Sequence, residues 1–541
     1  MKTLIKDILI NTLEVLKFPE EKIILENPKV VEHGDISTNI ALLLTKKLNK
    51  NPREIALSIV NHINSLNDPV FSSISIAGPG FINFKLSENF YHKNLLEIIN
   101  NANYGKIKPN NKSALVEFVS ANPTGPLTVG HGRGAVLGDT ISNILEWNGY
   151  NVNREYYFNN AGRQMRKLGE SVYSRYSQLY NDNTAFPEDG YKGDYIKEIS
   201  KIIAKEYNEN LLKSNDLSIF KDCAEKYVFK DIKSSLKKIN INFDSFFNED
   251  DLYKNGDIDK VISDLEKQNI IYQKDGATWF NAKIINREQD KVLIKSSGEP
   301  TYRLPDVAYH KNKFERNFDI VVDVFGADHT DTYPDVIALI NKLNCDIDKM
   351  RVIIHQFVTI TENGETVKMS TRKANFITLE ELCDEVGPDV LRYFFIMRGA
   401  NTHLNFDIGI AKKQSDDNPV FYLQYAYARI SNILNKANDL GYQIDKKVDL
   451  GLLNSDIEKN ILRKLYQFLE LIVKLKNTLE PQILANYLQS LSSLFHKFYV
   501  QNKVITDNAK LTSARLILIS GIKNVLKNGL NILGVNAPEK M

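Results

Sequence analysis

Residues 116–134 read VEFVSANPTGPLTVGHGRG, and this stretch decides the fold prediction. The apolar residues at 114–119 predict a strand that is covered on both faces, as in a parallel sheet. Two proline-containing pairs, Asn-Pro and Gly-Pro, predict a turn directly after this strand. A helix is then expected from about His131 to Trp147. The order strand, turn, helix favours an α/β fold.

Three glycines, Gly130, Gly132 and Gly134, fall where the predicted helix begins. They leave the backbone bare at a helix N-terminus, where free N–H groups and the helix dipole both favour an anion such as phosphate. Thr128 and His131 would add donors beside that site. The alternative is that these glycines only let the helix pack closely on the sheet, which is the better interpretation of a lone glycine-rich turn.

The second half of the chain favours the phosphate interpretation. A short basic segment, KMSTRK at residues 368–373, follows an expected strand at 350–359 and a Glu-Asn-Gly turn. The T-x-G-H turn and this segment resemble the two signature motifs of class I aminoacyl-tRNA synthetases. Further segments resemble the arginyl-tRNA synthetases in particular: VEFVSANPTGPL, REYYFNNAGRQ, GADHTDTY, KMSTRKANFITL and NPVFYLQYAYARI. The resemblance covers nearly the whole chain.

The composition is that of an ordinary globular protein of several domains. A length of 541 residues exceeds what one core supports, and a net charge of +2 gives no global basic field, so a tRNA partner would need local patches and shape. The three cysteines are far apart and form no C-x-x-C pair, which argues against a zinc site or a disulfide framework. The N-terminal segment is amphipathic, unlike a secretory signal, and no run of about 20 apolar residues could span a bilayer.

The predicted fold class is α/β: a doubly wound, Rossmann-like parallel-sheet catalytic domain with an insertion, an α+β N-terminal domain and an all-α C-terminal domain. The expected boundaries are 1–110 for an N-terminal domain that resembles the tRNA-contacting one of the family, 111–415 for the catalytic domain, and 416–541 for a helical anticodon-binding domain. The insertion is expected at about 180–295.

The family resemblance implies ATP-dependent attachment of L-arginine to tRNA(Arg) through an arginyl-adenylate, with release of pyrophosphate and AMP. It implies that Mg²⁺ arrives on the ATP phosphates, that the protein holds no metal of its own, and that tRNA binds before arginine is activated. We expect a cytoplasmic monomer without membrane contact. Matched motif by motif, the implied catalytic residues are Thr128, His131, Lys368, Ser370 and Arg372, and the implied ATP-binding residues are Gly130, Gly132, His329 and Met369.

A guanidinium substrate requires planar carboxylate partners and an aromatic or hydroxyl group beside them. The resemblance implies that Glu117 and Asn122 hold the substrate α-amino group, that Tyr302 and Asp306 read the guanidinium, and that Asp328 lies on another substrate-facing turn. The alternative for each isolated acid is a helix cap or a surface charge.

Two further groups are candidate tRNA contacts. Asn83 and Phe84 lie in the segment GPGFINFKL, where an amide could read a base edge and a ring could stack on it. Tyr422, Tyr425 and Arg429 lie on one predicted helix and could meet unpaired anticodon bases. The alternative for both groups is that the aromatic side chains belong to the core.

The sequence departs from the family pattern at two positions. Thr128 replaces the usual first histidine of the signature turn, and Thr371 replaces the second lysine of the basic segment, so Arg372 or Lys373 would supply that charge. Three rival interpretations follow: a cysteinyl synthetase, which would need a zinc site; a small-molecule nucleotidyltransferase, which the helical C-terminal part argues against; and a non-catalytic tRNA-binding paralogue.

Overall fold

A computed structural model describes residues 1–28, 30, 33–160, 162–181, 184–213, 216–362, 364–367 and 377–541. Contacts divide the chain into two compact units. The first unit comprises Met1–Tyr104, Asn432–Phe468 and Leu494–Val525, and the second comprises Gly105–Ser431, Leu469–Ser493 and Leu526–Met541.

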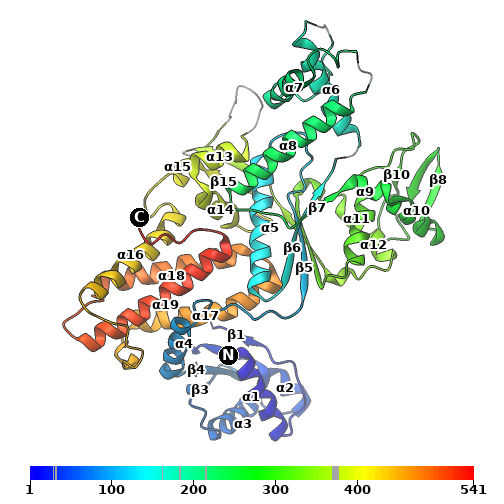
Figure 1. The fold of residues 1–541 in the computed structure, drawn as a ribbon. Helices are drawn as coiled ribbons and strands as arrows, with labels where there is room; N and C mark the ends of the chain where they lie inside the picture. Colours follow the sequence, from blue (N-terminus) through cyan, green and yellow to red (C-terminus); the bar gives the residue numbers. More distant parts are fainter. Residues whose placement is uncertain are drawn as a thin grey trace. The chain divides into compact units, whose positions relative to one another are not determined.

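The first unit contains an antiparallel sheet in the order β1-β2-β4-β3 (Figure 1). Its strands are β1 (Leu25–Glu26), β2 (Ile36–Thr38), β3 (Phe71–Ala77) and β4 (Phe81–Leu86). One apolar core joins this sheet to three helices, and a fourth helix follows β4: α1 (Lys2–Val15), α2 (Ile40–Leu48), α3 (Pro52–Ser65) and α4 (Glu88–Asn100). The Asn51 side chain caps α3 and Ser87 caps α4, as their positions before each helix favour.

The second unit is built around a five-stranded sheet in the order β12-β11-β5-β6-β7, in which every pairing is parallel. Its strands are β5 (Ser113–Phe118), β6 (Asn151–Phe158), β7 (Ser245–Asn248), β11 (Ile320–Gly326) and β12 (Met350–His355). The chain starts in the middle, at β5, runs outward to β7, and returns to β11 on the other side of β5. The predicted doubly wound fold is therefore confirmed, and β5 and β11 border its topological switch point, where such sheets bind ligands.

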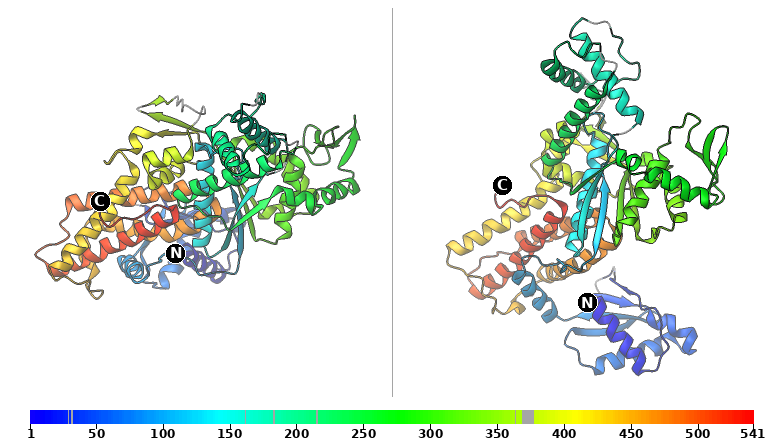
Figure 2. Two further views of the ribbon diagram at one scale, coloured as in Figure 1. Left: turned by 45° about the horizontal axis from the view of Figure 1, so that its top comes forward. Right: turned by 45° about the vertical axis from the view of Figure 1, so that its right-hand side comes forward.

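Helix α5 (Val129–Trp147) connects β5 to β6 and packs on the sheet. In both turned views of Figure 2 the cyan ribbons of α5, β5 and β6 stay side by side. Close packing is possible because Gly138 faces Phe118: a Cβ at Gly138 would lie only 2.1 Å from the Phe118 ring. Glycine at this position is thus required by the contact between helix and strand.

Two long segments are inserted between strands of the main sheet. Between β6 and β7 come α6 (Gly162–Gln178), α7 (Asp194–Tyr207) and α8 (Ser218–Lys238). Between β7 and β11 come three helices and an antiparallel sheet in the order β10-β9-β8: α9 (Glu249–Lys254), α10 (Asp257–Lys267), β8 (Ile271–Lys274), β9 (Ala277–Phe280), β10 (Lys291–Ile294) and α11 (Arg303–Glu315). The sequence analysis missed β7, which returns to the main sheet inside the segment expected to be an insertion.

After β11 the chain continues through short elements on the same unit. These are η2 (Ala327–His329), α12 (Tyr333–Lys342), η3 (Ile347–Lys349), β13 (Val358–Glu362), β14 (Glu365–Thr366), α13 (Leu379–Val386), α14 (Pro388–Ile396), β15 (Leu404–Asp407) and α15 (Ile408–Ala411). The strand expected at 350–359 is two strands: β12 belongs to the main sheet, whereas β13 pairs with β14 and β15. The break falls at Gln356, whose N–H donates to the carbonyl of Ala400 at 2.9 Å.

The C-terminal part is helical, as predicted: α16 (Pro419–Asp439), η4 (Leu450–Leu452), α17 (Asp456–Thr478), α18 (Pro481–Gln501) and α19 (Ala509–Leu533). Each of the four long helices contributes residues to both contact units. Among the described residues no helix combines the length and the apolar content needed to cross a bilayer.

A fully buried arginine, Arg392 on α14, connects separate segments of the second unit. Its Nη2 donates to Oδ2 of Asp139 at 2.5 Å, its Nη1 to the carbonyl of Ile239 at 2.9 Å, and its Nε to the carbonyl of Leu533 at 3.2 Å. One side chain therefore satisfies a carboxylate on α5 and two carbonyls at the ends of other helices.

Candidate active site

A cavity of about 660 Å³ opens at the carboxyl ends of β5 and β11, at the switch point of the sheet. The N-terminus of α5, the start of α11 and the η2 turn complete its wall. Many of the residues singled out by the sequence motifs line this one cavity: Glu117, Asn122, Thr128, Gly130, His131, Tyr302, Asp306, Asp328 and His329.

Thr128 and His131 cap the N-terminus of α5 together. The His131 N–H donates to Oγ1 of Thr128 at 3.4 Å, and the Thr128 N–H donates to Nδ1 of His131 at 3.1 Å. Because Nδ1 accepts, the ring proton of a neutral His131 is on Nε2. Burial lowers the pKa of His131, which favours that neutral form. The threonine in place of the usual histidine is therefore the cap of the helix, and His131 offers a neutral donor.

The glycines of the signature turn divide into two kinds. Gly130 lines the cavity, and a Cβ there would meet only the Thr128 hydroxyl, at 3.7 Å. Gly132, expected to contact ATP, is instead buried: a Cβ there would lie 2.4 Å from Cδ1 of Leu379. The correction follows from the helical period, since two residues along an α-helix point to a different side. Gly132 makes room for α13 and does not line the cavity.

The basic segment lies outside the described residues, so Lys368, Met369, Ser370 and Arg372 stay predictions. The chain that follows it is described. Thr378 forms an isolated antiparallel bridge with Thr128, and the Leu379 N–H donates to the carbonyl of Leu127 at 2.8 Å. The segment after the second signature motif is thus hydrogen-bonded to the first.

The backbone after β5 makes an unusual turn. Val119 and Ser120 have positive φ angles of 68° and 40°, which non-glycine residues rarely adopt. In this conformation the Ser120 Oγ donates to Oε1 of Glu117 at 2.7 Å and accepts the Tyr157 N–H at 3.1 Å. The turn therefore fixes the Glu117 carboxylate against the neighbouring strand β6.

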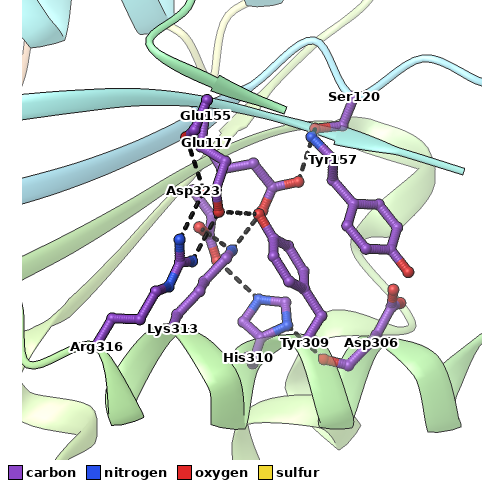
Figure 3. A network of polar contacts seen from close by, with 11 residues as sticks. Glu117, Ser120, Glu155, Tyr157, Asp306, Tyr309, His310, Lys313, Arg316 and Asp323 are labelled. Carbon is purple, nitrogen blue, oxygen red and sulfur yellow. Dashed lines mark hydrogen bonds and ion pairs between the residues drawn. The ribbon is translucent and has the colours of Figure 1, made fainter. Parts of the chain in front are cut away.

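Glu117 already has a cationic partner inside the protein (Figure 3). It is 2% exposed, and its Oε2 accepts a hydrogen bond from Nζ of Lys313, which is fully buried on α11. The same Nζ donates to Oδ1 of Asp323 at 2.7 Å. A substrate ammonium would therefore share Glu117 with Lys313. Glu117, His310 and Asp323 have the donor atoms of a metal site within 4.8 Å of one another, but the Lys313 ammonium bonds both carboxylates there.

Asp306 is the contrasting acid of the cavity. Its carboxylate makes no hydrogen bond or ion pair with any residue that the structure describes, and it lies near the Tyr157 side chain in Figure 3. Burial, with a smaller contribution from Glu117, raises the pKa of Asp306 against the opposing effect of His310 and His329. An ionised Asp306 thus has no hydrogen-bonded or ion-paired partner for its carboxylate among the described residues.

Glu249, a residue that the sequence analysis missed, lies behind Tyr157. It is 7% exposed and accepts the Tyr157 hydroxyl proton at 2.8 Å. Burial raises its pKa to about 7, and the neighbouring charge of Asp306 contributes to this rise. Two poorly compensated acids therefore interact near the pocket, which Asp306 lines and Glu249 reaches through Tyr157, and this suits a cationic ligand.

The remaining predicted residues line the rim. Nδ2 of Asn122 donates to Oε1 of Gln164 at 2.7 Å. Tyr302, at the start of α11, is 67% exposed. On the η2 turn the His329 ring stacks on Phe325 with centroids 4.8 Å apart, so it offers a flat surface beside the cavity.

Comparison with known proteins decides the family. The family model described as "tRNA synthetases class I (R), catalytic domain" matches residues 94–392. The model "Arginyl tRNA synthetase N terminal domain" matches residues 1–86, and "DALR anticodon binding domain" matches residues 423–541. The chain belongs to the arginyl-tRNA synthetase family. The boundaries 1–110, 111–415 and 416–541 remain our own division of it.

Curated relatives and solved structures agree with this assignment. The arginine–tRNA ligase of Chlorobium limicola is 49% identical over 527 residues, covering 96% of each chain. That of Salinibacter ruber is 45% identical over 536 residues, covering 96% of this chain and 95% of the relative. The arginyl-tRNA synthetase of Thermus thermophilus, at 19% identity, has the same fold over the full length of both chains, with a TM-score of 0.78.

Two of the tRNA contacts expected of an arginyl-tRNA synthetase need correction. Phe84 is fully buried and packs against Phe71 with ring centroids 5.4 Å apart, and Asn83 is 5% exposed. Phe84 belongs to the core of the first unit, whereas Asn83 points to the other face of β4 and is nevertheless buried, so neither side chain is exposed for contact with a base. Phe81, on the same strand, is 39% exposed and is the ring that remains accessible.

The aromatic residues of α16 remain candidates for tRNA contact in this arginyl-tRNA synthetase. Tyr422, Tyr425 and Arg429 are half-buried. The Arg429 guanidinium lies over the Tyr425 ring at 4.5 Å from its centroid, and Phe421 stacks on the same Tyr425 ring with centroids 5.9 Å apart. These side chains support one another, and their role in binding RNA stays a prediction.

The sequence contained one signal for the missed pocket residues. Asp306, His310 and Lys313 are spaced four and three residues apart in a predicted helix, so they share one face. His310 and Lys313 thus share a helix face with Asp306, the proposed ligand contact, which indicates that this whole face is polar. The partner acids Glu117 and Asp323 lie opposite each other in the β5–β11 register, which only the fold reveals.

Proposed function

We propose that this protein attaches L-arginine to tRNA(Arg) at the expense of ATP, through an arginyl-adenylate, with release of pyrophosphate and AMP. The observation that carries the proposal is the Asp306 carboxylate, unpaired among the described residues, in a cavity that the signature turn also lines. The turn supplies phosphate donors, and the acid supplies a partner for a guanidinium. Family membership independently favours the same reaction.

In the first step a carboxylate oxygen of arginine attacks the α-phosphorus of ATP, and the bond to pyrophosphate breaks. Negative charge grows on the phosphate oxygens in the transition state, so alignment and fixed donors are what the protein must provide. The neutral Nε2–H of His131 and the free N–H groups of α5 are such donors. We expect Mg²⁺ to be held mainly by the ATP phosphates, with few protein ligands.

Recognition of arginine is assigned to the two poorly compensated acids. A guanidinium presents parallel N–H groups that match carboxylates bidentately, which a lysine ammonium cannot do. Asp306 would contact it directly, with the Tyr302 side chain at the rim and Glu249 reinforcing the negative potential through Tyr157. Asn122 and Glu117 would hold the α-amino group, Asp328 would lie on another turn that faces the arginine, and His329 would face the ATP.

The decisive experiment is pyrophosphate exchange with arginine, measured with and without tRNA(Arg). We expect arginine-dependent exchange that requires tRNA, as the family resemblance implies. Exchange with no amino acid, even when tRNA is present, would favour the non-catalytic paralogue. Exchange with a different amino acid would reject the arginine pocket.

Replacement of Lys368 by alanine is expected to lower the rate of arginine activation by about tenfold or more, because a cation beside the pyrophosphate acts mainly in the transition state. Binding of tRNA, measured by filter retention, should stay within a factor of two. A normal activation rate would remove Lys368 from the mechanism. Replacement of the exposed Lys283 by alanine is a suitable control.

Replacement of Glu249 by glutamine is expected to stabilise the protein at pH 8. Folding raises the pKa of this acid from 4.5 to about 7, so the free energy of unfolding of the protein falls as the pH rises through that window. The glutamine avoids a loss of up to about 3 kcal/mol at pH 8 and gives no gain at pH 4. Thermal melts at both pH values check this, with exposed Glu266 changed to glutamine as the control.

The same Glu249→Gln variant should bind arginine more weakly, because the pocket loses negative charge. A variant that is more stable but has a raised KM for arginine would support the assignment of Glu249 to the pocket. If the variant and the wild type were equally stable at pH 8 as well as at pH 4, ionisation of Glu249 would not destabilise the folded protein.

A further inference from the structure

We propose that His310 is a positioning residue of the arginine pocket and that it is held there as an imidazolium. His310 is on α11, is 5% exposed and lines the cavity. Its effect on arginine binding rests on the proposed function, whereas its charge can be tested independently of any activity.

Each ring nitrogen of His310 faces an atom that can only accept a hydrogen bond. Nδ1 is 2.7 Å from the backbone carbonyl oxygen of Asp306, and Nε2 is 2.8 Å from Oδ2 of Asp323. A neutral imidazole has a single N–H, so one nitrogen would direct its lone pair at an oxygen lone pair. An imidazolium donates at both nitrogens. The geometry therefore requires the charged form.

Asp323 cannot relieve this requirement by acting as a donor. It is fully buried, and Nζ of Lys313 lies 2.7 Å from its other oxygen, Oδ1. Burial by itself raises the pKa of Asp323, but Lys313 and His310 outweigh that effect and lower it to about 2. The carboxylate is thus ionised and accepts at both oxygens.

The charge count of this cluster leads to the same conclusion. Glu117 and Asp323 contribute two negative charges, and Lys313 contributes one positive charge, all three at 2% exposure or less. A neutral His310 would leave one buried negative charge uncompensated, which is costly away from water. A charged His310 balances the cluster.

The buried acid Glu155, on the neighbouring strand β6, does not change this count. On β6, Glu155 is paired with Arg316, whose Nη1 and Nη2 lie 2.6 and 2.7 Å from its oxygens, and it also accepts the Tyr309 hydroxyl proton. The groups around His310 are Asp306 and Tyr309 on α11, Asp323 and Phe325 on β11 and Glu117 on β5, with Lys313 of α11 between the two carboxylates. His329, on η2, acts on the Asp306 carboxyl.

The consequence for the pocket is a separation of roles among its acids. The hydrogen-bond chain Ser120–Glu117–Lys313–Asp323–His310 neutralises the strand-end carboxylates and ends on the backbone of Asp306. Only the Asp306 carboxylate itself is left without a partner among the described residues. His310 therefore holds both the position of α11 and the distribution of charge that directs a guanidinium to Asp306.

The charge of His310 is tested by ¹⁵N NMR of the wild-type protein with labelled histidine. The chain has nine histidines, and the signal of His310 is assigned as the one missing from the His310→Gln spectrum. We expect both ring nitrogens of His310 to carry a proton in this spectrum, because each faces an acceptor oxygen. A single unprotonated nitrogen at pH 7 would overturn the proposal, whatever the protein's catalytic activity.

The positioning role is tested by kinetics of His310→Gln. The glutamine amide carries no positive charge, so it cannot neutralise Asp323. Asp323 then competes with Glu117 for Lys313, and we expect the site for the substrate α-amino group to shift. We expect the KM for arginine to rise about tenfold while the KM for ATP stays within a factor of two, with exposed His403→Gln unchanged as the control. An unchanged arginine KM in His310→Gln would reject the role. If wild-type exchange with arginine were absent, the proposed function would fail while the NMR result would stand.

Discussion

Replacement of Asp306 by alanine is expected to raise the KM for arginine by about 100-fold or more. Each charge-assisted hydrogen bond between a carboxylate and a guanidinium contributes about 1.5–3 kcal/mol, and a bidentate pair makes two of them. Removal of the carboxylate also leaves the guanidinium buried without its counter-charge. Because Asp306 has no partner among the described side chains, its loss breaks few interactions of the protein itself.

The measurement is tRNA-dependent pyrophosphate exchange at varied arginine and at varied ATP. The KM for ATP should change by less than twofold, because the phosphate donors of α5 are untouched. The exposed Asp331, on the loop after η2, provides a matched aspartate-to-alanine control. An arginine KM equal to that of the wild type would remove Asp306 from the pocket.

Replacement of Arg392 by methionine is expected to destabilise the protein by about 3–5 kcal/mol, the range found when one partner of a buried ion pair is removed. Methionine fills a similar length but leaves the carbonyls of Ile239 and Leu533 without their donor. Asp139 keeps only Arg154, whose Nε lies 3.3 Å away. The loss therefore combines an uncompensated charge with unsatisfied carbonyls.

Urea denaturation monitored by fluorescence measures this effect. Arg392→Lys should give an intermediate loss, because an ammonium can replace one contact but not the geometry of the guanidinium fork. The exposed Arg398, six residues later, changed to methionine, should alter stability by less than about 0.5 kcal/mol. A loss below about 1 kcal/mol for Arg392→Met would contradict the linking role of this side chain.

The fold was predictable where local signals were strong. The buried strand β5 and the glycine-rich start of α5 follow from the apolar run and the proline–glycine turn. The observed strand lies one residue earlier than predicted, at Ser113–Phe118, and the helix begins at Val129 instead of about His131. Strand β7 was not predictable, because SFFN is four residues long and becomes a strand only by pairing with β6. The break between β12 and β13 likewise depends on a distant carbonyl, that of Ala400.

The site residues were predictable where they lie in motifs that the chain shares with the family. Motif matching brought residues more than 200 positions apart, such as Asn122 and Asp328, to one cavity wall. It failed for Phe84, since a β-strand residue faces the core or the solvent according to a register that the motif does not contain. It also missed Lys313, whose role arises only when α11 packs on the paired carboxylates of two strands.

The left-handed turn at Val119 and Ser120 has a consequence for how the protein matures. Each such residue costs an isolated chain about 1–2 kcal/mol, so the unfolded and partly folded ensembles avoid this conformation. The turn persists only once Tyr157 on β6 and Lys313 on α11 supply their contacts. A nascent chain that has not yet emerged through α11 therefore lacks Lys313, and with it the contact that holds the Glu117 carboxylate in place in the pocket.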